Sequence, residues 1–280
     1  MRKRAAALML GSVVSVQGGQ AFGKLLSGVA GPFGVITLRL SLAALALLVL
    51  WRPRLPSRGT RLLVIGLGTA IAGMNVIYLA LERLPIGIAA TLQFLGPFTV
   101  ALSGTRRLRD AGWAVLAAAG VALFYGRAGG LTSVSGTVLA LCSGASMACY
   151  TVLSKRAGAR ATDGSLLAWA VAWAAMVSLP FGIVAGRHLT RPGVLLAGAF
   201  VALSGALSWS LDLAALRRLP ARVVAVLQSL EPAAGGLAGL VVAGQHLTRT
   251  QWLAISCVTV AAVGAVGTAP AQPAERKTRS

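Results

Sequence analysis

The stretch Ala80–Pro97, ALERLPIGIAATLQFLGP, recurs in this chain as ALRRLPARVVAVLQSLEP at Ala215–Pro232. The two copies begin 135 positions apart. Each copy contains the end of one apolar segment, a turn opened by a proline, and the start of the next apolar segment. Proline suits the first turn of a helix, where its missing N–H has no partner within the helix. A repeat of this length indicates that the chain is built from two related halves.

The second proline of each copy, Pro97 or Pro232, predicts a structural kink within an otherwise helical segment. An internal proline removes one backbone hydrogen bond and crowds the carbonyl four residues earlier. Those carbonyls belong to Gln93 and Gln228. In lipid a released carbonyl needs a partner inside the protein or in a water-filled cavity. Two interpretations are open: the kinks line a substrate path, or they serve packing alone.

Composition predicts a membrane protein. The 280 residues are 56% apolar and 11% charged, with a mean hydropathy of +0.79. Apolar runs of roughly 18 to 24 residues follow one another, each long enough to cross a bilayer. We therefore predict an all-α integral membrane protein with ten transmembrane helices surrounded by membrane lipid. The expected spans are about 5–27, 32–51, 61–81, 85–104, 110–126, 133–154, 164–185, 193–215, 220–243 and 250–269.

The net charge of +20 predicts membrane orientation and not nucleic-acid binding. The basic residues lie in short loops beside spans, and they form no face interleaved with aromatic residues of the kind that binds single strands. With the N-terminus inside, 19 Lys and Arg residues lie on the inner side and 5 on the outer side. This bias predicts a multi-pass protein of the cytoplasmic membrane with both termini in the cytoplasm. The five outer residues are Arg83, Arg127, Arg187, Arg191 and Arg249.

Five spans in each half is an odd number, so the second half is expected to insert upside down relative to the first. The predicted fold is two inverted five-helix repeats, 1–127 and 131–269, followed by a disordered cytoplasmic tail at 270–280. The motif agrees: its outer copy carries Glu82 and Arg83, whose charges cancel, whereas its inner copy carries Arg217 and Arg218. Inverted repeats with broken helices are typical of transporters.

Charged side chains inside spans are costly and mark functional sites by default. Four lie there: Lys24, Arg39, Asp212 and Glu231. Glu231 stands in mid-span next to Pro232, and apolar surroundings disfavour the charged form of a carboxyl. It is therefore the candidate proton-coupling residue. The alternatives are a structural partner for Arg39 or a hydrogen bond that stabilises the kink.

Lys24 shares one helical face with Gln17 and Gln20, and such a face can hold a carboxylate or a polar substrate. Alternatively, Lys24 extends to the outer interface. Other spans carry further polar faces, but small polar residues also join helices without touching substrate. The candidate substrate-binding residues are Gln17, Gln20, Lys24, Asn75, Tyr78, Gln93, Tyr150, Ser208, Asp212 and Gln228.

Metal and catalytic motifs are missing from the sequence. Cys142, Cys149 and Cys257 lie in apolar spans without metal-ligand spacing or a disulfide framework. His188 and His246 are isolated in loops. No nucleophile stands with a base, and no phosphate loop is present. We therefore predict no metal, no cofactor and no enzymatic activity.

The chain resembles the EamA-type drug/metabolite transporter superfamily along nearly its whole length, and within it most the bacterial threonine/homoserine exporters. The Arg83-to-Pro97 repeat is one carrier of the resemblance. The others are Val16-Gln17-Gly18-Gly19 with Lys24, Leu38-Arg39-Leu40, Gly73-Met74-Asn75, Lys155-Arg156-Ala157-Gly158 and Leu230-Glu231-Pro232. The Glu-Pro pair is common across EamA proteins and supports the superfamily only. The strings in the first and third spans point to the exporters.

The resemblance implies a cavity lined by the first, third, fourth, sixth, eighth and ninth spans. It also implies export of a small amino acid, threonine or homoserine, by alternating access, with proton exchange expected. Two departures stand out: Gly244-Gln245 where many relatives have Gly-Glu, and Asp212 where the longer Glu is expected. One alternative is an efflux carrier for drugs or other small metabolites, which an aromatic cavity would favour. Another is a membrane-embedded enzyme or lipid-handling protein, which would need a clustered acid, base or metal.

Overall fold

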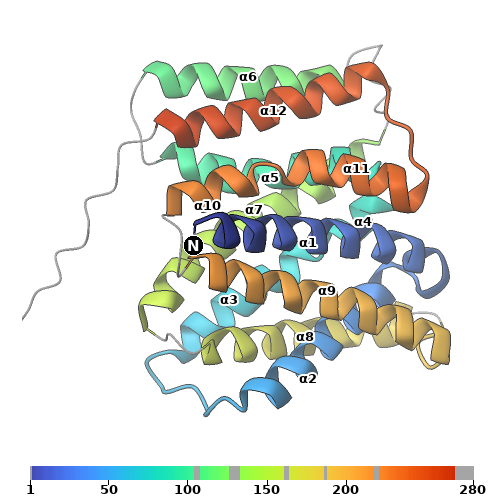
Figure 1. Cartoon of the computed structure of the whole chain (residues 1–280). Helices are drawn as coiled ribbons and strands as arrows, with labels where there is room; N and C mark the ends of the chain where they lie inside the picture. Colours follow the sequence, from blue (N-terminus) through green and yellow to red (C-terminus); the bar gives the residue numbers. More distant parts are fainter. Residues whose placement is uncertain are drawn as a thin grey trace, which may run out of the picture.

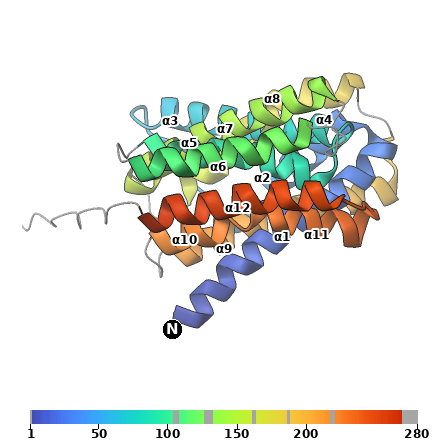
Figure 2. The ribbon, with the colours of Figure 1, turned by 90° about the horizontal axis from the view of Figure 1, so that it is seen from above.

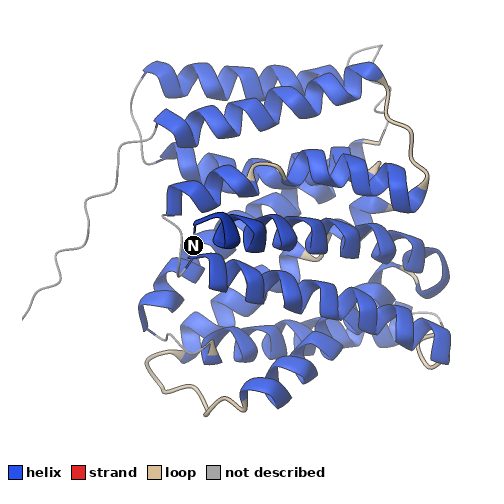
Figure 3. Cartoon of the chain, viewed as in Figure 1, coloured by secondary structure: helices blue, strands red, loops and turns tan. Residues whose placement is uncertain are grey.

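The computed structural model describes residues 2–103, 108–125, 133–160, 164–185, 188–216 and 221–268. These ranges contain helices joined by loops, and no strand occurs within them (Figure 3). The helices are α1 (Arg2–Ala30), α2 (Pro32–Trp51), α3 (Arg61–Met74), α4 (Ile77–Leu81), α5 (Ile86–Ser103), α6 (Leu108–Tyr125), α7 (Val134–Arg160), α8 (Ser165–Ala185), α9 (Pro192–Leu216), α10 (Ala221–Gln228), α11 (Glu231–Ala243) and α12 (Arg249–Thr268). The predicted tail at 270–280 and the turn of the second motif copy at 217–220 lie outside the described residues.

Eight segments of the described chain are long and apolar enough to cross a membrane, and Ala111–Tyr125 within α6 is a shorter apolar helix. The predicted all-α membrane class is therefore confirmed. The eight segments are Pro32–Trp51, Arg61–Leu81, Ile86–Ser103, Val134–Ala157, Ser165–Val184, Pro192–Asp212, Val226–Ala243 and Arg249–Gly267.

Two of the expected spans consist of two short helices each. The span at 61–81 is interrupted at Asn75 and Val76, between α3 and α4. The span at 220–243 is interrupted between α10 and α11, and Pro232 stands in the first turn of α11. By contrast, α5 continues through Pro97. The two copies of the motif therefore differ: the helix breaks near Pro232 but runs on past Pro97, where a bend stays a prediction.

Several helix ends use the residue types that permit sharp turns. Gly31, with φ 72°, separates α1 from α2, which then begins at Pro32. Gly244, with φ 61°, ends α11, and the next N–H, of Gln245, donates to the carbonyl of Gly239 at 3.0 Å. Such left-handed positions favour glycine because it has no Cβ. The released helix-end carbonyls thereby find donors within the chain, as lipid demands.

Most helices run along one common direction and pack side by side (Figures 1 and 2). α6 and α12 pack together at one edge of the bundle, and α2 and α8 pack together at the opposite edge (Figure 1). Between these edges α1 packs against both α9 and α11, and α7 packs against both α5 and α3. The polar residues of α1 therefore lie in the middle of the bundle.

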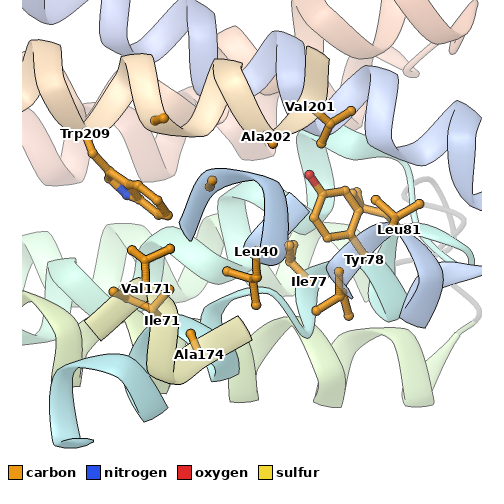
Figure 4. Close-up of a cluster of buried hydrophobic side chains, with 14 of the residues drawn as sticks. Leu40, Ile71, Ile77, Tyr78, Leu81, Val171, Ala174, Val201, Ala202 and Trp209 are labelled. Carbon is orange, nitrogen blue, oxygen red and sulfur yellow. The ribbon is translucent and has the colours of Figure 1, made fainter. Parts of the chain in front are cut away.

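A cluster of buried apolar side chains joins the helices around α4 (Figure 4). Leu40 of α2, Ile71 of α3, Val171 of α8 and Val201 of α9 belong to it, and each is at most 1% exposed. Tyr78 of α4 is buried in the same cluster and brings the only hydroxyl among the labelled residues (Figure 4). This packing holds the short helix α4 in place beside α1.

Candidate functional site

Small polar residues join α1 to α9. The Ser12 hydroxyl donates to the Ser208 carbonyl at 3.1 Å and lies 2.8 Å from the Ser208 hydroxyl. One turn further along α1, the Ser15 hydroxyl donates to the Ser204 carbonyl at 2.9 Å. Gly19, one turn after Ser15, packs directly against the Ser204 side chain. Small residues of this kind allow two helices to approach closely in a membrane. We call the line of polar groups along α1, with the side chains that face it, the polar seam.

The first level of the seam is acidic and contains Asp212, Glu231 and Tyr150. Asp212 lies one turn beyond Ser208 on α9, close to Ser12. Its Oδ1 atom is buried and has no hydrogen-bond partner among the described residues. Asp212 also interacts electrostatically with Glu231 of α11 and with Tyr150 of α7. Three helices distant in sequence therefore bring their polar groups together beside Ser12.

Glu231 is the first residue of α11, directly after the break that follows α10. A carboxylate at this position is favoured by the free N–H groups and the dipole of the helix N-terminus. Gln228 ends α10 three residues earlier and is half-buried. The break thus places Glu231 at a helix end that faces another acid. Glu231 interacts electrostatically with Asp212 and not with Arg39.

The second level contains the amides of Gln17, Gln20 and Gln93. The Gln20 Nε2 atom donates to Gln93 Oε1 at 3.4 Å. Gln93 Nε2 in turn donates to the Ser143 hydroxyl at 2.7 Å and to the Met74 carbonyl at 3.2 Å. Ser143 donates to the same carbonyl at 2.6 Å. Met74 is the last residue of α3, so side chains from α5 and α7 supply the donors that the break between α3 and α4 requires.

Two amide oxygens of this level have no hydrogen-bond partner among the residues that the structure describes. Gln17 is 2% exposed and Gln20 is 5% exposed, and the Oε1 atom of each is buried and unpaired. Gln17 lies against Gly235 of α11, where a Cβ atom would come within 3.0 Å of Oε1. Asn75 is also buried, but its Nδ2 atom donates to the Ile71 carbonyl at 2.8 Å. An unpaired buried acceptor is costly, so Gln17 and Gln20 are sites where a ligand donor would be stabilised.

The third level is cationic and contains Lys24, Arg39 and Tyr78. The Lys24 ammonium donates to the Leu84 carbonyl at 2.8 Å, in the turn that opens the repeated motif. Arg39 of α2 donates from Nη1 to the Tyr78 hydroxyl at 2.5 Å. Gly23, the neighbour of Lys24, packs against the Tyr78 ring. The Tyr78 side chain therefore connects Arg39 of α2 to this part of α1.

The cationic and acidic levels are far apart along the seam. Lys24 lies twelve positions after Ser12 on α1, which corresponds to about 18 Å along a helix. The amide level lies between them. The structure therefore does not bring Lys24 together with Asp212 or Glu231, and one small amino acid cannot contact both ends at once in this conformation.

A groove of about 680 Å³ opens on another side of α1, between α1, α2 and α9. Exposed apolar side chains such as Val14, Leu50 and Leu203 line it. Gln17 and Gln20 do not belong to its lining. In a membrane such a surface faces lipid tails. The groove meets the polar seam only at Ser15, Gly19 and Ser204, and the charged and amide side chains of the seam do not line it.

Comparison with known proteins identifies the fold and the family. A crystal structure of a protein that is 20% identical matches with a TM-score of 0.64, covering 96% of this chain and 97% of the other. The threonine/homoserine exporter RhtA of Escherichia coli (strain K12) is 37% identical over 269 residues, which are 92% of this chain and 89% of the exporter. RhtA of Salmonella typhimurium (strain SL1344) is 37% identical over 278 residues, 95% of this chain and 92% of the exporter. The EamA-like transporter family matches residues 134–267.

The chain belongs to the EamA-like transporter family. It is thus a multi-pass membrane transporter and not an enzyme. As an EamA-like transporter it carries its polar seam along α1, with side chains from α2, α4, α5, α7, α9 and α11 that face it.

Sequence reasoning missed Ser12, which connects α1 to Asp212 and Ser208. The available signal was the spacing of Ser12, Ser15 and Gly19 at positions i, i+3 and i+7, which puts small residues on one helical face. Gln245, noted only as a departure from relatives, accepts a hydrogen bond from the Ile86 N–H at 2.9 Å. It thereby ties the loop after α11 to the start of α5.

Proposed function

We propose that this transporter exports small amino acids of the threonine and homoserine type across the cytoplasmic membrane by alternating access. The observation that carries the proposal is the polar seam, with its unpaired Gln17, Gln20 and Asp212 oxygens in the middle of an apolar bundle. The similarity to two RhtA exporters over at least 92% of the chain supports the choice of substrate.

The seam has the chemistry that a hydroxylated amino acid needs. A zwitterion in a low-dielectric site requires partners for both charges, because an unpaired buried charge is very costly. Asp212 and the amide oxygens can accept from an ammonium or a hydroxyl group. Further donors and acceptors come from Asn75, Gln93, Gln228 and Ser208. Tyr78 adds a hydroxyl group at the cationic level, and Tyr150 adds one at the acidic level. A site that hydrogen-bonds a hydroxyl rejects analogues that lack it, because its own polar groups are then left unpaired.

The proposed topology has ten spans, as two inverted five-helix repeats with both termini in the cytoplasm. In it, α1 and α6 cross the membrane along with the eight segments named above, and the halves are residues 1–127 and 131–269.

The packing of the helices supports a two-fold axis that relates the halves. The equivalent helices are α1 and α7, α2 and α8, α3 and α9, α5 and α11, and α6 and α12. Exchanging them turns the α1–α9 contact into α7–α3, α1–α11 into α7–α5, and α2–α9 into α8–α3, and all six contacts occur. The α2–α8, α5–α11 and α6–α12 contacts map onto themselves. Such repeats move against each other around a central site in alternating access.

Glu231 is the proposed proton-coupling residue. It lies at a helix break opposite Asp212, and two neighbouring acids in a buried site do not readily both carry charge. One of them therefore tends to hold a proton, and binding of the substrate ammonium would favour its release. This gives a reason for exchanging an inward-moving proton for an outward-moving amino acid.

Flux in reconstituted vesicles tests the function. Proteoliposomes loaded with radiolabelled L-threonine or L-homoserine should release either compound faster than protein-free liposomes, and faster still with an inward proton gradient. A Gln17→Leu, Gln20→Leu variant that inserts normally should lose most of this release, because both unpaired acceptors are gone. Protein that moves neither amino acid but moves an apolar cation would replace this proposal with drug efflux.

A further inference from the structure

Arg39 is a buried cation whose donors are only partly used. It is 5% exposed. Its Nη1 atom donates to the Tyr78 hydroxyl, and its guanidinium carbon lies 5.6 Å from the centre of the Tyr78 ring. Its Nε atom is buried and has no hydrogen-bond partner among the described residues. A guanidinium has five N–H donors and no acceptor. A buried charge of this kind is costly unless a partner arrives.

The free edge of the guanidinium faces glycine. A Cβ atom at Gly205 of α9 would lie 3.0 Å from Nη2 and 3.2 Å from Nε of Arg39. Nε and Nη2 carry the pair of parallel N–H groups that a carboxylate binds with both oxygens. At this point α9 therefore covers the carboxylate-binding edge of Arg39 with backbone alone. A small movement of α9 away from α2 would uncover both donors together.

The other charged groups of the seam are already engaged or distant. The Lys24 ammonium has the Leu84 carbonyl as its acceptor. Among the carboxylates that the structure describes, Asp212 and Glu231 lie in the interior and interact with each other at the acidic level. Glu82 is exposed, beyond the end of α4. Within the described residues, Arg39 is thus the buried cation whose carboxylate-binding edge has no acceptor.

We propose that Arg39 binds the α-carboxylate of the substrate through Nε and Nη2. The carboxylate reaches these two donors when α9, with Gly205, moves away from Arg39. This inference rests on the proposed function, because it assumes an amino-acid substrate. It also fixes a direction for the substrate in the seam. The ammonium lies toward the acidic level and the carboxylate toward the cationic level, so a zwitterion moves along the seam carboxylate first.

The test compares L-threonine with L-threoninamide, in which a neutral amide replaces the carboxylate. The measurement is the ratio of kcat/KM for the two compounds in proteoliposome efflux. The wild-type ratio should favour threonine, and Arg39→Gln should lower that ratio on the order of a hundredfold, as expected when a charged hydrogen-bond pair in a buried site is lost. Arg39→Lys should recover only part of the preference, because an ammonium lacks the paired donors.

Two further variants keep the test independent of folding. Gly205→Ala retains the charge but places a methyl group on the free edge, so the ratio should fall at least about tenfold while threoninamide transport is preserved. Arg83→Gln is the matched control: Arg83 is exposed and donates to the Leu79 carbonyl, so the ratio should stay near that of the wild type.

The outcomes separate the two proposals. Equal losses for threonine and threoninamide in the Arg39 and Gly205 variants would mean a purely structural arginine and would overturn the inference. If Arg39→Gln fails to insert, an unchanged ratio in Gly205→Ala overturns it instead. A wild-type protein that moves neither compound contradicts the proposed function itself, and the inference with it.

Discussion

Adjacent glycines on α1 allow a sharp test of the contact between α1 and α9. A Cβ atom added at Gly18 meets no atom within 4 Å. A Cβ atom added at Gly19 overlaps the Ser204 side chain, with the Ser204 Cβ atom at 2.9 Å and the hydroxyl closer still. Both positions lie within the same helix, one residue apart. Gly19→Ala should therefore destabilise the transporter, and Gly18→Ala should not.

The expected difference follows from two magnitudes. Replacing glycine by alanine inside a helix stabilises by about 1 kcal/mol, and this gain is common to both variants. Forcing an extra methyl group into a packed contact costs about 1 to 3 kcal/mol, and only Gly19→Ala has this cost. The two variants should thus differ by about 1 to 3 kcal/mol. In chains of about 150 to 250 residues, 1 kcal/mol shifts the melting temperature by about 2 to 4 °C. The melting temperatures of the two variants should therefore differ by about 2 to 12 °C.

The assay is the thermal loss of helical circular dichroism for each variant purified in the same detergent. Ser204→Gly supplies the compensating change, because it removes the obstructing atoms. That substitution has its own helix cost of about 1 kcal/mol, so the double variant is compared with Ser204→Gly alone. In that background Gly19→Ala should cost nothing. Equal melting temperatures for Gly18→Ala and Gly19→Ala, or an undiminished cost in the Ser204→Gly background, would refute this packing of α1 on α9.

Two further predictions concern coupling and topology. Glu231→Gln cannot release a proton, so efflux should lose its dependence on the proton gradient while the protein still inserts; a gradient dependence equal to that of the wild type would remove Glu231 from the mechanism. For topology, single cysteines at Gly59 and Thr190 in a background without the three native cysteines should react differently with an impermeant thiol reagent on intact cells. Thr190→Cys should be labelled and Gly59→Cys should not, and the reverse pattern would contradict cytoplasmic termini.

The class of the protein follows from sequence because lipid leaves the backbone few choices. Apolar runs that cross a membrane must pair their N–H and C=O groups internally, which favours helices. A kink near Pro232 was likewise predicted, since proline cannot supply a backbone N–H, but the same residue type at Pro97 leaves α5 continuous. The sequence also pointed to the charges inside spans, because such residues are rare there for a physical reason. Composition and single residues were sufficient for the class of the protein and for its buried charges, but not for which of the two prolines accompanies a break.

The break between α3 and α4 required the tertiary structure. Asn75 and Val76 are not helix breakers of the proline kind, and the freed Met74 carbonyl is satisfied by Gln93 and Ser143. These donors come from α5 and α7, and Ser143 lies 69 positions away along the chain. Local sequence holds no signal for a break whose partners are so distant.

The partners of the buried charges also came only from the folded chain. The spacing of Gln17, Gln20 and Lys24 established that they share a face of α1, but not what that face meets. The rotation and depth of each packed helix direct Lys24 to the Leu84 carbonyl and Arg39 to Tyr78. Sequence thus determined which side chains are costly to bury, because that cost belongs to the side chain itself. Packing alone decided which groups offset the cost, because the partners lie on helices that meet only in the folded bundle.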